Sequence, residues 1–323
     1  MKSFKHINAA TVEQASKLLR ESHGRARLNA GGTDLLSTLK DKILPDYPET
    51  IINLKTISSL NYIREDRNVL MIGATAKLAD IAHSPLVREK YPLLADAVEA
   101  VATPNIRNMA TIGGNLCQET RCWYYRYPHQ IGERLVCLRK GGEKCYGQVG
   151  DSRYHAIMAA EGCYAVCPSD AAVALAALNG SVVVKGGKGT RAIAVTEFYN
   201  SFGTELGADE VLIEVRVPTP PAGSKQVYQK FRLRQPIDFA IVSVASLMVK
   251  DGERFKEARL ALGGVAHTPL RAAQAEAMLK DKVPNAELAE QVASQAVASA
   301  QPLSKNAYKV EEVKVLVKRA VMA

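Results

Sequence analysis

The stretch Arg27-Leu28-Asn29-Ala30-Gly31-Gly32-Thr33-Asp34-Leu35 predicts a short strand, a glycine loop and the start of a helix. A helix that begins after a Thr11/Gln14 capping box and ends near Gly24 precedes this stretch. A buried strand at 50–54 follows it. The alternation of helix and strand favours parallel strands. Because glycine has no Cβ, the backbone N–H groups of Gly31-Gly32 can approach an oxyanion closely.

A second glycine pair, Gly113-Gly114, lies in a predicted tight turn at 111–115, after a strand that begins at Val69 and a helix at 84–101. Together the two pairs can form a cradle for a diphosphate. Neither pair belongs to a Walker loop or a G-x-G-x-x-G motif, and either alone is typical of an ordinary turn. By the same local reading, Asp34 and Asp170 are helix caps or solvated carboxylates.

The rest of the chain predicts a second unit. A small-residue helix follows Pro168-Ser169-Asp170, and a strand begins at Ser181. The proline- and glycine-rich stretch 217–225 is the clearest linker, which places a domain boundary near residue 220. Beyond it the patterns predict strands followed by helices, an α+β order. The strands are expected at 226–234, 239–250 and 259–264, and the helices at 271–279, 287–298 and 304–321.

All six cysteines of this 323-residue chain lie within 51 residues, at Cys117, Cys122, Cys137, Cys145, Cys163 and Cys167. No secretory signal is apparent in the first residues, so we expect a reducing compartment and take disulfides as the minority interpretation. Structural zinc usually shows C-x2-C pairs, and no two of these cysteines have that spacing. The long, uneven gaps suit an iron–sulfur cluster better. A cluster needs four thiolates, and the spacing alone leaves open which four of the six bind.

Charge and hydropathy exclude other classes. The net charge of +9 comes from 42 basic and 33 acidic residues, but the basic residues are scattered and aromatic residues make up only 6%. This pattern argues against nucleic-acid binding and fits an anionic cofactor or partner better. No apolar run approaches the ~20 residues of a membrane-spanning helix. We therefore expect a soluble, cytoplasmic protein, with export alongside a signal-bearing partner subunit as the alternative.

Four motifs together resemble the FAD-binding medium subunit of the molybdenum hydroxylase family, which includes xanthine dehydrogenases, aldehyde oxidoreductases and carbon monoxide dehydrogenase. The resemblance covers essentially the whole chain, in the same order. The motifs are Ala30-Gly31-Gly32-Thr33-Asp34, Ile106-Arg107-Asn108-Met109-Ala110-Thr111-Ile112-Gly113-Gly114-Asn115-Leu116, Ala165-Val166-Cys167-Pro168-Ser169-Asp170 and Ala261-Leu262-Gly263-Gly264-Val265-Ala266.

The resemblance implies an α+β protein with a two-part FAD-binding domain of the vanillyl-alcohol-oxidase (PCMH) type and a C-terminal α+β domain of the CO dehydrogenase flavoprotein type. The corresponding ranges are 1–220, divided into 1–57 and 58–220, and 224–323. The resemblance also implies that Asp170 binds ribose or ribityl hydroxyls and that Lys230 lies near the flavin. It assigns the diphosphate and its pocket to Asn29, Ala30, Gly31, Gly32, Thr33, Asp34, Leu35, Thr111, Gly114 and Asn115.

Residues 118–164 form an insertion that ordinary members of the family lack. It resembles the insertion of 4-hydroxybenzoyl-CoA reductase and of bacterial aldehyde oxidoreductases whose flavin subunit holds an extra [4Fe–4S] cluster. Carried over by motif, the ligands are Cys122, Cys137, Cys145 and Cys163. Cys117 and Cys167 are then non-ligands.

The resemblance also implies a function within a complex. Substrate is oxidised at molybdopterin in a large subunit, and a small subunit with two [2Fe–2S] clusters connects that site to this FAD. The extra cluster would link FAD to a one-electron partner such as ferredoxin. The segment from Gly263 to Arg271 is closer to the aldehyde and xanthine branch, so we expect oxidation of aldehydes or aromatic heterocycles. Two alternatives remain, a reductase of the 4-hydroxybenzoyl-CoA type that runs from ferredoxin, and a zinc-stabilised binding module.

Overall fold

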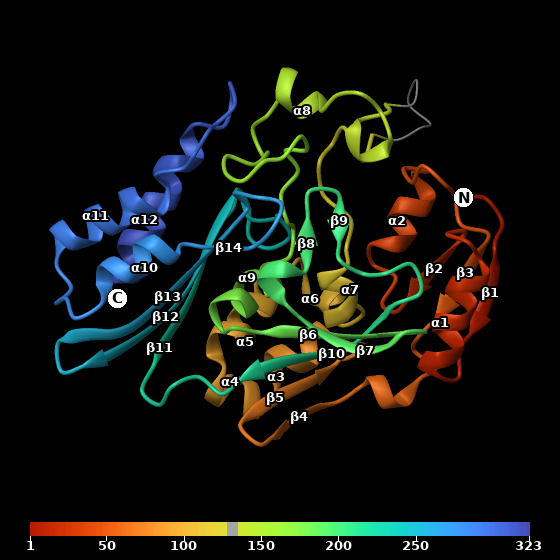
Figure 1. Cartoon of the computed structure of the whole chain (residues 1–323), viewed down its shortest axis with the longest axis horizontal. Helices are drawn as coiled ribbons and strands as arrows, with labels where there is room; N and C mark the ends of the chain where they lie inside the picture. The colour runs from red at the N-terminus through yellow and green to blue at the C-terminus, as the bar shows by residue number, and fades with distance from the viewer. Residues whose placement is uncertain (128–134) are drawn as a thin grey trace.

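The computed structural model describes residues 1–127 and 135–323. Its first unit is a small parallel sheet in the order β1-β3-β2, shown in red in Figure 1. Thr11 Oγ1 accepts the N–H of Gln14, so the predicted capping box opens α1. The elements are β1 (Lys5–Asn8), α1 (Val12–Glu21), β2 (Ala26–Asn29), α2 (Leu35–Lys40) and β3 (Thr50–Asn53). The predicted parallel arrangement is confirmed, with β1 as a strand that the sequence patterns did not reveal.

The second unit is a five-stranded antiparallel sheet in the order β4-β5-β10-β6-β7. Helices α3, α5 and α9 bury one continuous apolar core with it. Its strands are β4 (Ile63–Asp66), β5 (Val69–Gly73), β6 (Ser181–Gly186), β7 (Gly189–Ala194) and β10 (Val211–Pro218), with a β8 (Tyr199–Asn200) and β9 (Gly203–Thr204) hairpin beside them. The helices are α3 (Leu78–His83), α4 (Pro85–Lys90), α5 (Pro92–Glu99), α6 (Pro104–Arg107), α7 (Ile112–Leu116) and α9 (Asp170–Ala177), preceded by the 3-10 turn η1 (Ser58–Leu60).

Two local predictions in this unit were wrong. The single helix expected over 84–101 is two helices that meet at Tyr91, because Pro92 disfavours a helical conformation in the residue before it. The turn expected at 111–115 is the short helix α7. Thr111 caps α7, since its Oγ1 accepts the N–H of Gly114 at 3.2 Å.

The C-terminal domain has strands first and helices after, as predicted. Its antiparallel sheet runs β11-β12-β13-β14, with α10, α11 and α12 packed on one face. Helix α9 packs against strands of the same sheet and is buried along its whole length, so it joins the two domains. The elements are β11 (Lys225–Phe231), β12 (Val242–Asp251), β13 (Arg254–Gly263), β14 (Leu270–Arg271), α10 (Ala273–Leu279), α11 (Ala286–Ala296) and α12 (Tyr308–Met322).

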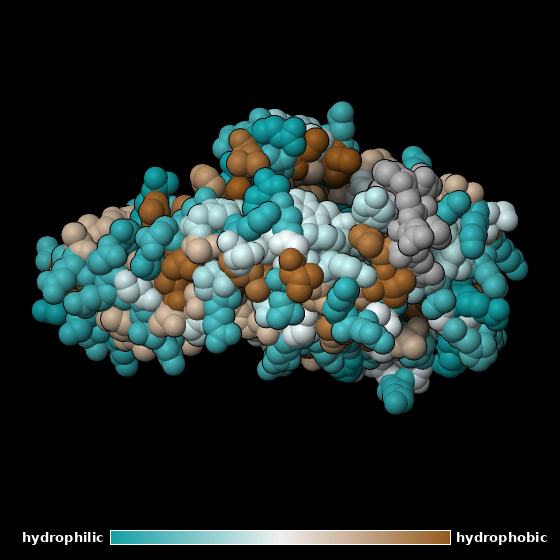
Figure 2. Space-filling model, turned by 90° about the horizontal axis from the view of Figure 1, so that it is seen from above, coloured by the Kyte–Doolittle hydropathy of each residue, from teal (hydrophilic) through white to brown (hydrophobic). Residues whose placement is uncertain are grey.

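The described part of the insertion, residues 118–127 and 135–164, is here called the cysteine-rich segment and lies across the top of Figure 1, between the C-terminal helices and α2. Its described part contains only two short helical turns, η2 (Leu138–Lys140) and α8 (Tyr146–Val149). The C-terminal domain binds the end of this segment through hydrogen bonds. Ile157 N–H donates to Val265 O, and Asn306 Nδ2 donates to the carbonyls of His155 and Ala156. Figure 2 looks onto this side and shows apolar patches among hydrophilic residues. Within the described ranges, no helix is both long and apolar enough to span a bilayer.

Candidate functional site: a glycine-lined cleft and two smaller cavities

A cleft of about 810 Å³ runs between the first unit and the second, and we call it the glycine cleft. Both predicted glycine loops line it. The loop after β2 lies directly against the chain before α7. The approach is so close that a Cβ on Gly31 would stand 2.2 Å from the carbonyl oxygen of Met109. Gly32 has φ +74°, a conformation that side chains rarely adopt. The predicted residues that line the glycine cleft are Asn29, Ala30, Gly31, Gly32, Thr33, Asp34, Leu35, Thr111, Gly114 and Asn115.

The glycine cleft offers unused hydrogen-bonding groups. The N–H groups of Gly31, Gly32 and Thr33 donate to no acceptor in the described part of the chain. Asn29 Oδ1 is buried there and accepts no hydrogen bond from the residues that the structure describes. Such groups cost free energy unless a ligand or water satisfies them. Free N–H donors next to a helix start suit phosphate oxygens, and the Asn29 acceptor suits a ligand hydroxyl or amine.

Thr111 and Asn115 also hold the second loop in place. Asn115 Oδ1 accepts the hydroxyl of Ser169 at 2.5 Å, which ties α7 to the start of α9. Ser169 in turn caps α9 by accepting the N–H of Ala172 at 3.0 Å. The predicted cap before α9 is therefore Ser169 rather than Asp170.

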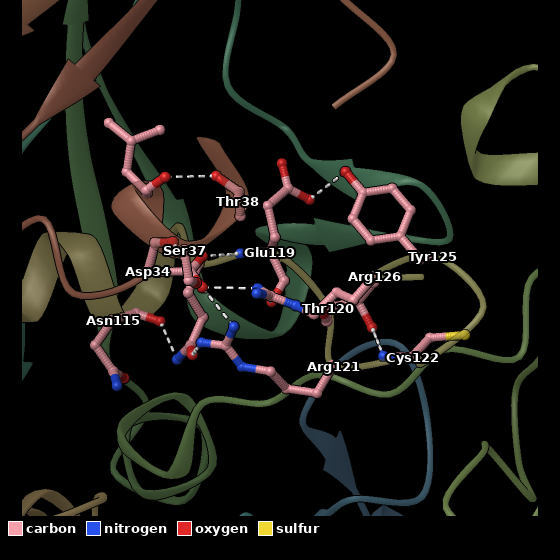
Figure 3. A network of polar contacts seen from close by, with 12 residues as sticks. Asp34, Ser37, Thr38, Asn115, Glu119, Thr120, Arg121, Cys122, Tyr125 and Arg126 are labelled. Carbon is pink, nitrogen blue, oxygen red and sulfur yellow. Dashed lines mark hydrogen bonds and ion pairs between the residues drawn. The ribbon is translucent and has the colours of Figure 1, made fainter. Parts of the chain in front are cut away.

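Asp34 fastens the cysteine-rich segment to the glycine loop, as Figure 3 shows. Its Oδ1 accepts from the guanidinium groups of Arg121 and Arg126, and its Oδ2 accepts the N–H of Glu119 at 2.8 Å. Burial opposes ionisation of Asp34, but the two guanidinium groups outweigh that cost and hold the carboxyl pKa below its usual value. Asp34 makes no side-chain cap bond to α2, so the helix-cap interpretation is wrong.

We expect Asp34→Asn to lower the free energy of unfolding by about 2 kcal/mol, because two partly buried guanidinium groups lose their counter-charge. A urea titration at neutral pH measures this. Since the folded state depresses the Asp34 pKa, the stabilisation is present above the ordinary carboxyl pKa and is lost as the pH falls through the folded-state pKa. The matched control is Asp96→Asn, which breaks an exposed pair with Arg88. Equal losses in the two variants would contradict this role for Asp34.

A second cavity of about 390 Å³, the Asp170 cavity, lies between the domains and shares Arg121 and Phe239 with the glycine cleft. Asp170 lines it and is almost fully buried. Lys230 Nζ donates to the Asp170 carboxylate at 2.7 Å, and the Tyr228 hydroxyl donates to it at 2.5 Å. Lys230 also donates to the carbonyl of Ala100. The predicted Asp170 and Lys230 thus form one buried, paired site at the first turn of α9.

A third, small cavity brings together Cys122, Cys137, Cys145 and Cys163, and we call it the cysteine cavity. Cys122 and Ala165 also line the Asp170 cavity. The Asp170 cavity therefore adjoins the cysteine cavity on one side and the glycine cleft on the other. Cys117 instead lines the glycine cleft, and Cys167 lines the Asp170 cavity. Among the described residues, no three Cys, His, Asp or Glu side chains converge closely enough to hold a single ion. The four thiols therefore do not have the close spacing of a mononuclear site, in which sulfur lies about 2.3 Å from zinc.

His155 is the polar neighbour of this cluster, with Nε2 3.2 Å from Cys122 Sγ. Burial, helped by the charge of Lys309, lowers the pKa of His155 to about 4. Burial likewise raises the pKa of the Cys122 thiol to about 11. Burial thus favours the protonated thiol. A bound metal favours the thiolate instead, because it coordinates the deprotonated sulfur.

The sequence patterns missed Arg121, Arg126, Tyr228 and His155. Each acts on a residue that is distant in the chain, so no local motif marks it. The one available signal was the short spacing of Arg121 and Arg126 around Cys122, inside the insertion.

Comparison with known proteins agrees with this geometry. Residues 2–220 match the family described as the FAD binding domain in molybdopterin dehydrogenase, and residues 226–323 match the CO dehydrogenase flavoprotein C-terminal domain. The chain belongs to this FAD-binding family. It is a flavin-binding medium subunit of the molybdenum hydroxylases, and its relatives are subunits of oxidoreductases.

Individual relatives cover almost the whole chain. The aldehyde oxidoreductase FAD-binding subunit PaoB of Escherichia coli is 36% identical over 318 residues, which are 96% of this chain and 94% of PaoB. The glyceraldehyde dehydrogenase medium chain of Sulfolobus acidocaldarius is 28% identical and covers 98% of this chain and 96% of its own. The solved carbon monoxide dehydrogenase of Hydrogenophaga pseudoflava aligns with a TM-score of 0.80 at 29% identity, over 100% of this chain and 97% of that one. The fold predicted from the motifs is thereby confirmed.

Proposed function

We propose that this chain is the electron-transfer subunit of a heterotrimeric molybdenum hydroxylase and holds a [4Fe–4S] cluster in addition to FAD. The observation that carries the proposal is the cysteine cavity. Four of the six cysteines line it, they come from separate parts of the insertion, and they are the four that the resemblance assigned as ligands. Four thiolates around one space are what a [4Fe–4S] cluster requires.

The glycine cleft fits FAD. The N–H groups of Gly31, Gly32 and Thr33 would bind diphosphate oxygens, and Asn29 Oδ1 would accept from a hydroxyl or amine of the cofactor. The contiguous Asp170 cavity would hold the remaining part, next to the Asp170–Lys230 pair. When bound, FAD exchanges electrons in pairs or singly and a cluster exchanges them one at a time, so the two together join carriers of both kinds.

The partners of the chain follow from the same proposal. We expect a molybdopterin-binding large subunit and a small subunit with two [2Fe–2S] clusters, together with a one-electron carrier such as ferredoxin at the insertion. Exposed apolar side chains border the mouth of the cavities on the β11–β12 connection, where Leu233 is 67% and Ile237 54% exposed. Patches of this kind mark protein interfaces. PaoB and the Sulfolobus chain belong to enzymes named for aldehydes, which makes aldehydes the first substrates to test.

The test is the cofactor content of protein purified without oxygen. We expect one FAD, about four iron atoms and about four acid-labile sulfides per chain, with a broad iron–sulfur absorbance. Zinc in place of iron, with no labile sulfide, would contradict the cluster. Iron and sulfide without a flavin spectrum would contradict the assignment of the glycine cleft.

A further inference from the structure

The imidazole of His155 contacts Cys122, which is the one cysteine that lines two of the described cavities. His155 is 3% exposed and lines the Asp170 cavity. Its Nε2 lies 3.2 Å from Cys122 Sγ, and Cys122 lines both the Asp170 cavity and the cysteine cavity. The imidazole therefore contacts Cys122, a proposed cluster ligand that also lines the Asp170 cavity, where we place part of the flavin.

The chain fixes the backbone of His155 from two directions. Its N–H donates to Ser152 O at 2.9 Å, and its carbonyl accepts from Lys309 Nζ at 3.0 Å and from Asn306 Nδ2 at 3.1 Å. Lys309 and Asn306 are themselves fully buried. The position of the imidazole is thus set by the C-terminal domain as well as by the insertion.

The imidazole ring of His155 is packed closely by its neighbours. The rings of Trp123 and Tyr124 lie at centroid distances of 6.0 and 5.9 Å from it. A Cβ on Gly147 would stand 2.6 Å from the Cδ2 and Nε2 atoms of His155. Gly147 lines the cysteine cavity and is two residues beyond Cys145. The absence of a side chain at position 147 is what allows the imidazole to reach Cys122.

We propose that His155 is a positioning residue for the cluster: its Nε2–H donates a hydrogen bond to Cys122 Sγ and raises the reduction potential of the [4Fe–4S] cluster. This inference rests on the proposed function, since it takes Cys122 as a ligand. A liganding sulfur offers only lone pairs, so the proton of the contact must be on Nε2. A donor stabilises the negative charge that reduction adds to the cluster, and such bonds are a known control of cluster potentials.

The decisive variant is His155→Phe, which keeps a ring and removes the N–H donor. In an EPR-monitored redox titration of the holoenzyme, we expect the equilibrium constant for reduction of the cluster to fall about tenfold, which is about 59 mV for one electron. Iron and FAD contents should remain those of the wild type. His155→Gln, whose side-chain amide can donate from a similar position, should recover part of the loss.

A second variant leaves the histidine in place. Gly147→Ala adds a methyl group where the ring stands, so it should displace the imidazole and lower the cluster potential in the same direction. The matched control is Tyr308→Phe, which removes a hydroxyl that donates to Arg153 O, two residues before His155, at a position that lines none of the three cavities. Tyr308→Phe should leave the potential unchanged.

The outcomes separate the two claims. An intact cluster whose potential is the same in the wild type, His155→Phe and Gly147→Ala overturns the role of His155 and leaves the cluster assignment standing. A wild-type protein without a cluster overturns the proposed function itself. If His155→Phe assembles no cluster, pulsed EPR of wild-type protein labelled with ¹⁵N-histidine decides, because a hydrogen-bonded imidazole must show nitrogen coupling to the reduced cluster and its absence overturns the inference.

Discussion

Substitution of Cys137 by serine is expected to abolish the [4Fe–4S] signal and to leave about one FAD per chain. Cys137 is buried in the cysteine cavity, and serine is a poor ligand for iron in a site built for soft thiolates. Its carbonyl accepts from the N–H groups of Lys140 and Gly142, and serine can keep both bonds. The turn around residue 137 should therefore survive while the cluster is lost.

Iron analysis and low-temperature EPR of the dithionite-reduced protein measure the loss of the cluster, and flavin absorbance measures FAD. The matched control is Cys117→Ser, because Cys117 ends α7 and lines the glycine cleft instead. That variant should keep the full iron content. A complete cluster spectrum in Cys137→Ser would show that another set of thiols binds the iron.

The second large effect is expected for Gly31→Ala, which should reduce bound FAD to less than a tenth of the wild-type content. The added Cβ would lie 2.2 Å from Met109 O and 2.9 Å from Ala110 Cα, and both neighbours are backbone atoms that cannot rotate away. Such overpacking typically costs 1–3 kcal/mol or more, and here the simplest relief is to separate the two glycine loops. Separation would remove the Gly31–Thr33 donors from the rest of the glycine cleft.

FAD per chain after gel filtration measures this effect, with iron content as the internal reference. Iron should be largely retained, because none of the four cysteines of the cysteine cavity lines the glycine cleft. The control is Gly203→Ala, since a Cβ at Gly203 meets no atom within 4 Å and its φ is not positive. If the Gly31→Ala protein binds as much FAD per chain as the wild type, FAD binding does not depend on the close approach of the two loops.

Local structure was largely predictable from the sequence because its signals are local. The Thr11/Gln14 capping box, the strand and helix on either side of Gly31-Gly32, and the strand-then-helix order after residue 225 all appear in the structure. Pairings between distant segments were not predictable in this way. Strand β10 lies between β5 and β6, and its partner β5 is about 140 residues earlier in the chain, so no pattern within either strand specifies the sheet order.

The same limit applies to the site. The resemblance placed Asp34 with the cofactor loop. In the structure Asp34 lines the glycine cleft, but its carboxylate pairs with Arg121 and Arg126 from the insertion. The cysteine spacing alone could not choose four of six thiols, because the choice depends on how an irregular segment folds back. The resemblance assigned four of them by motif, and in the structure those four line the cysteine cavity while Cys117 and Cys167 line the other two spaces.

The insertion is secured at its beginning to the first unit by Asp34 and at its end to the C-terminal domain by Asn306 and Lys309. Domains that enclose a ligand commonly open and close around it. Here such a hinge motion would have to break both attachments together. The segment therefore links the first unit to the C-terminal domain, and under the function proposed above the separation of flavin and cluster would be fixed by contacts within this chain.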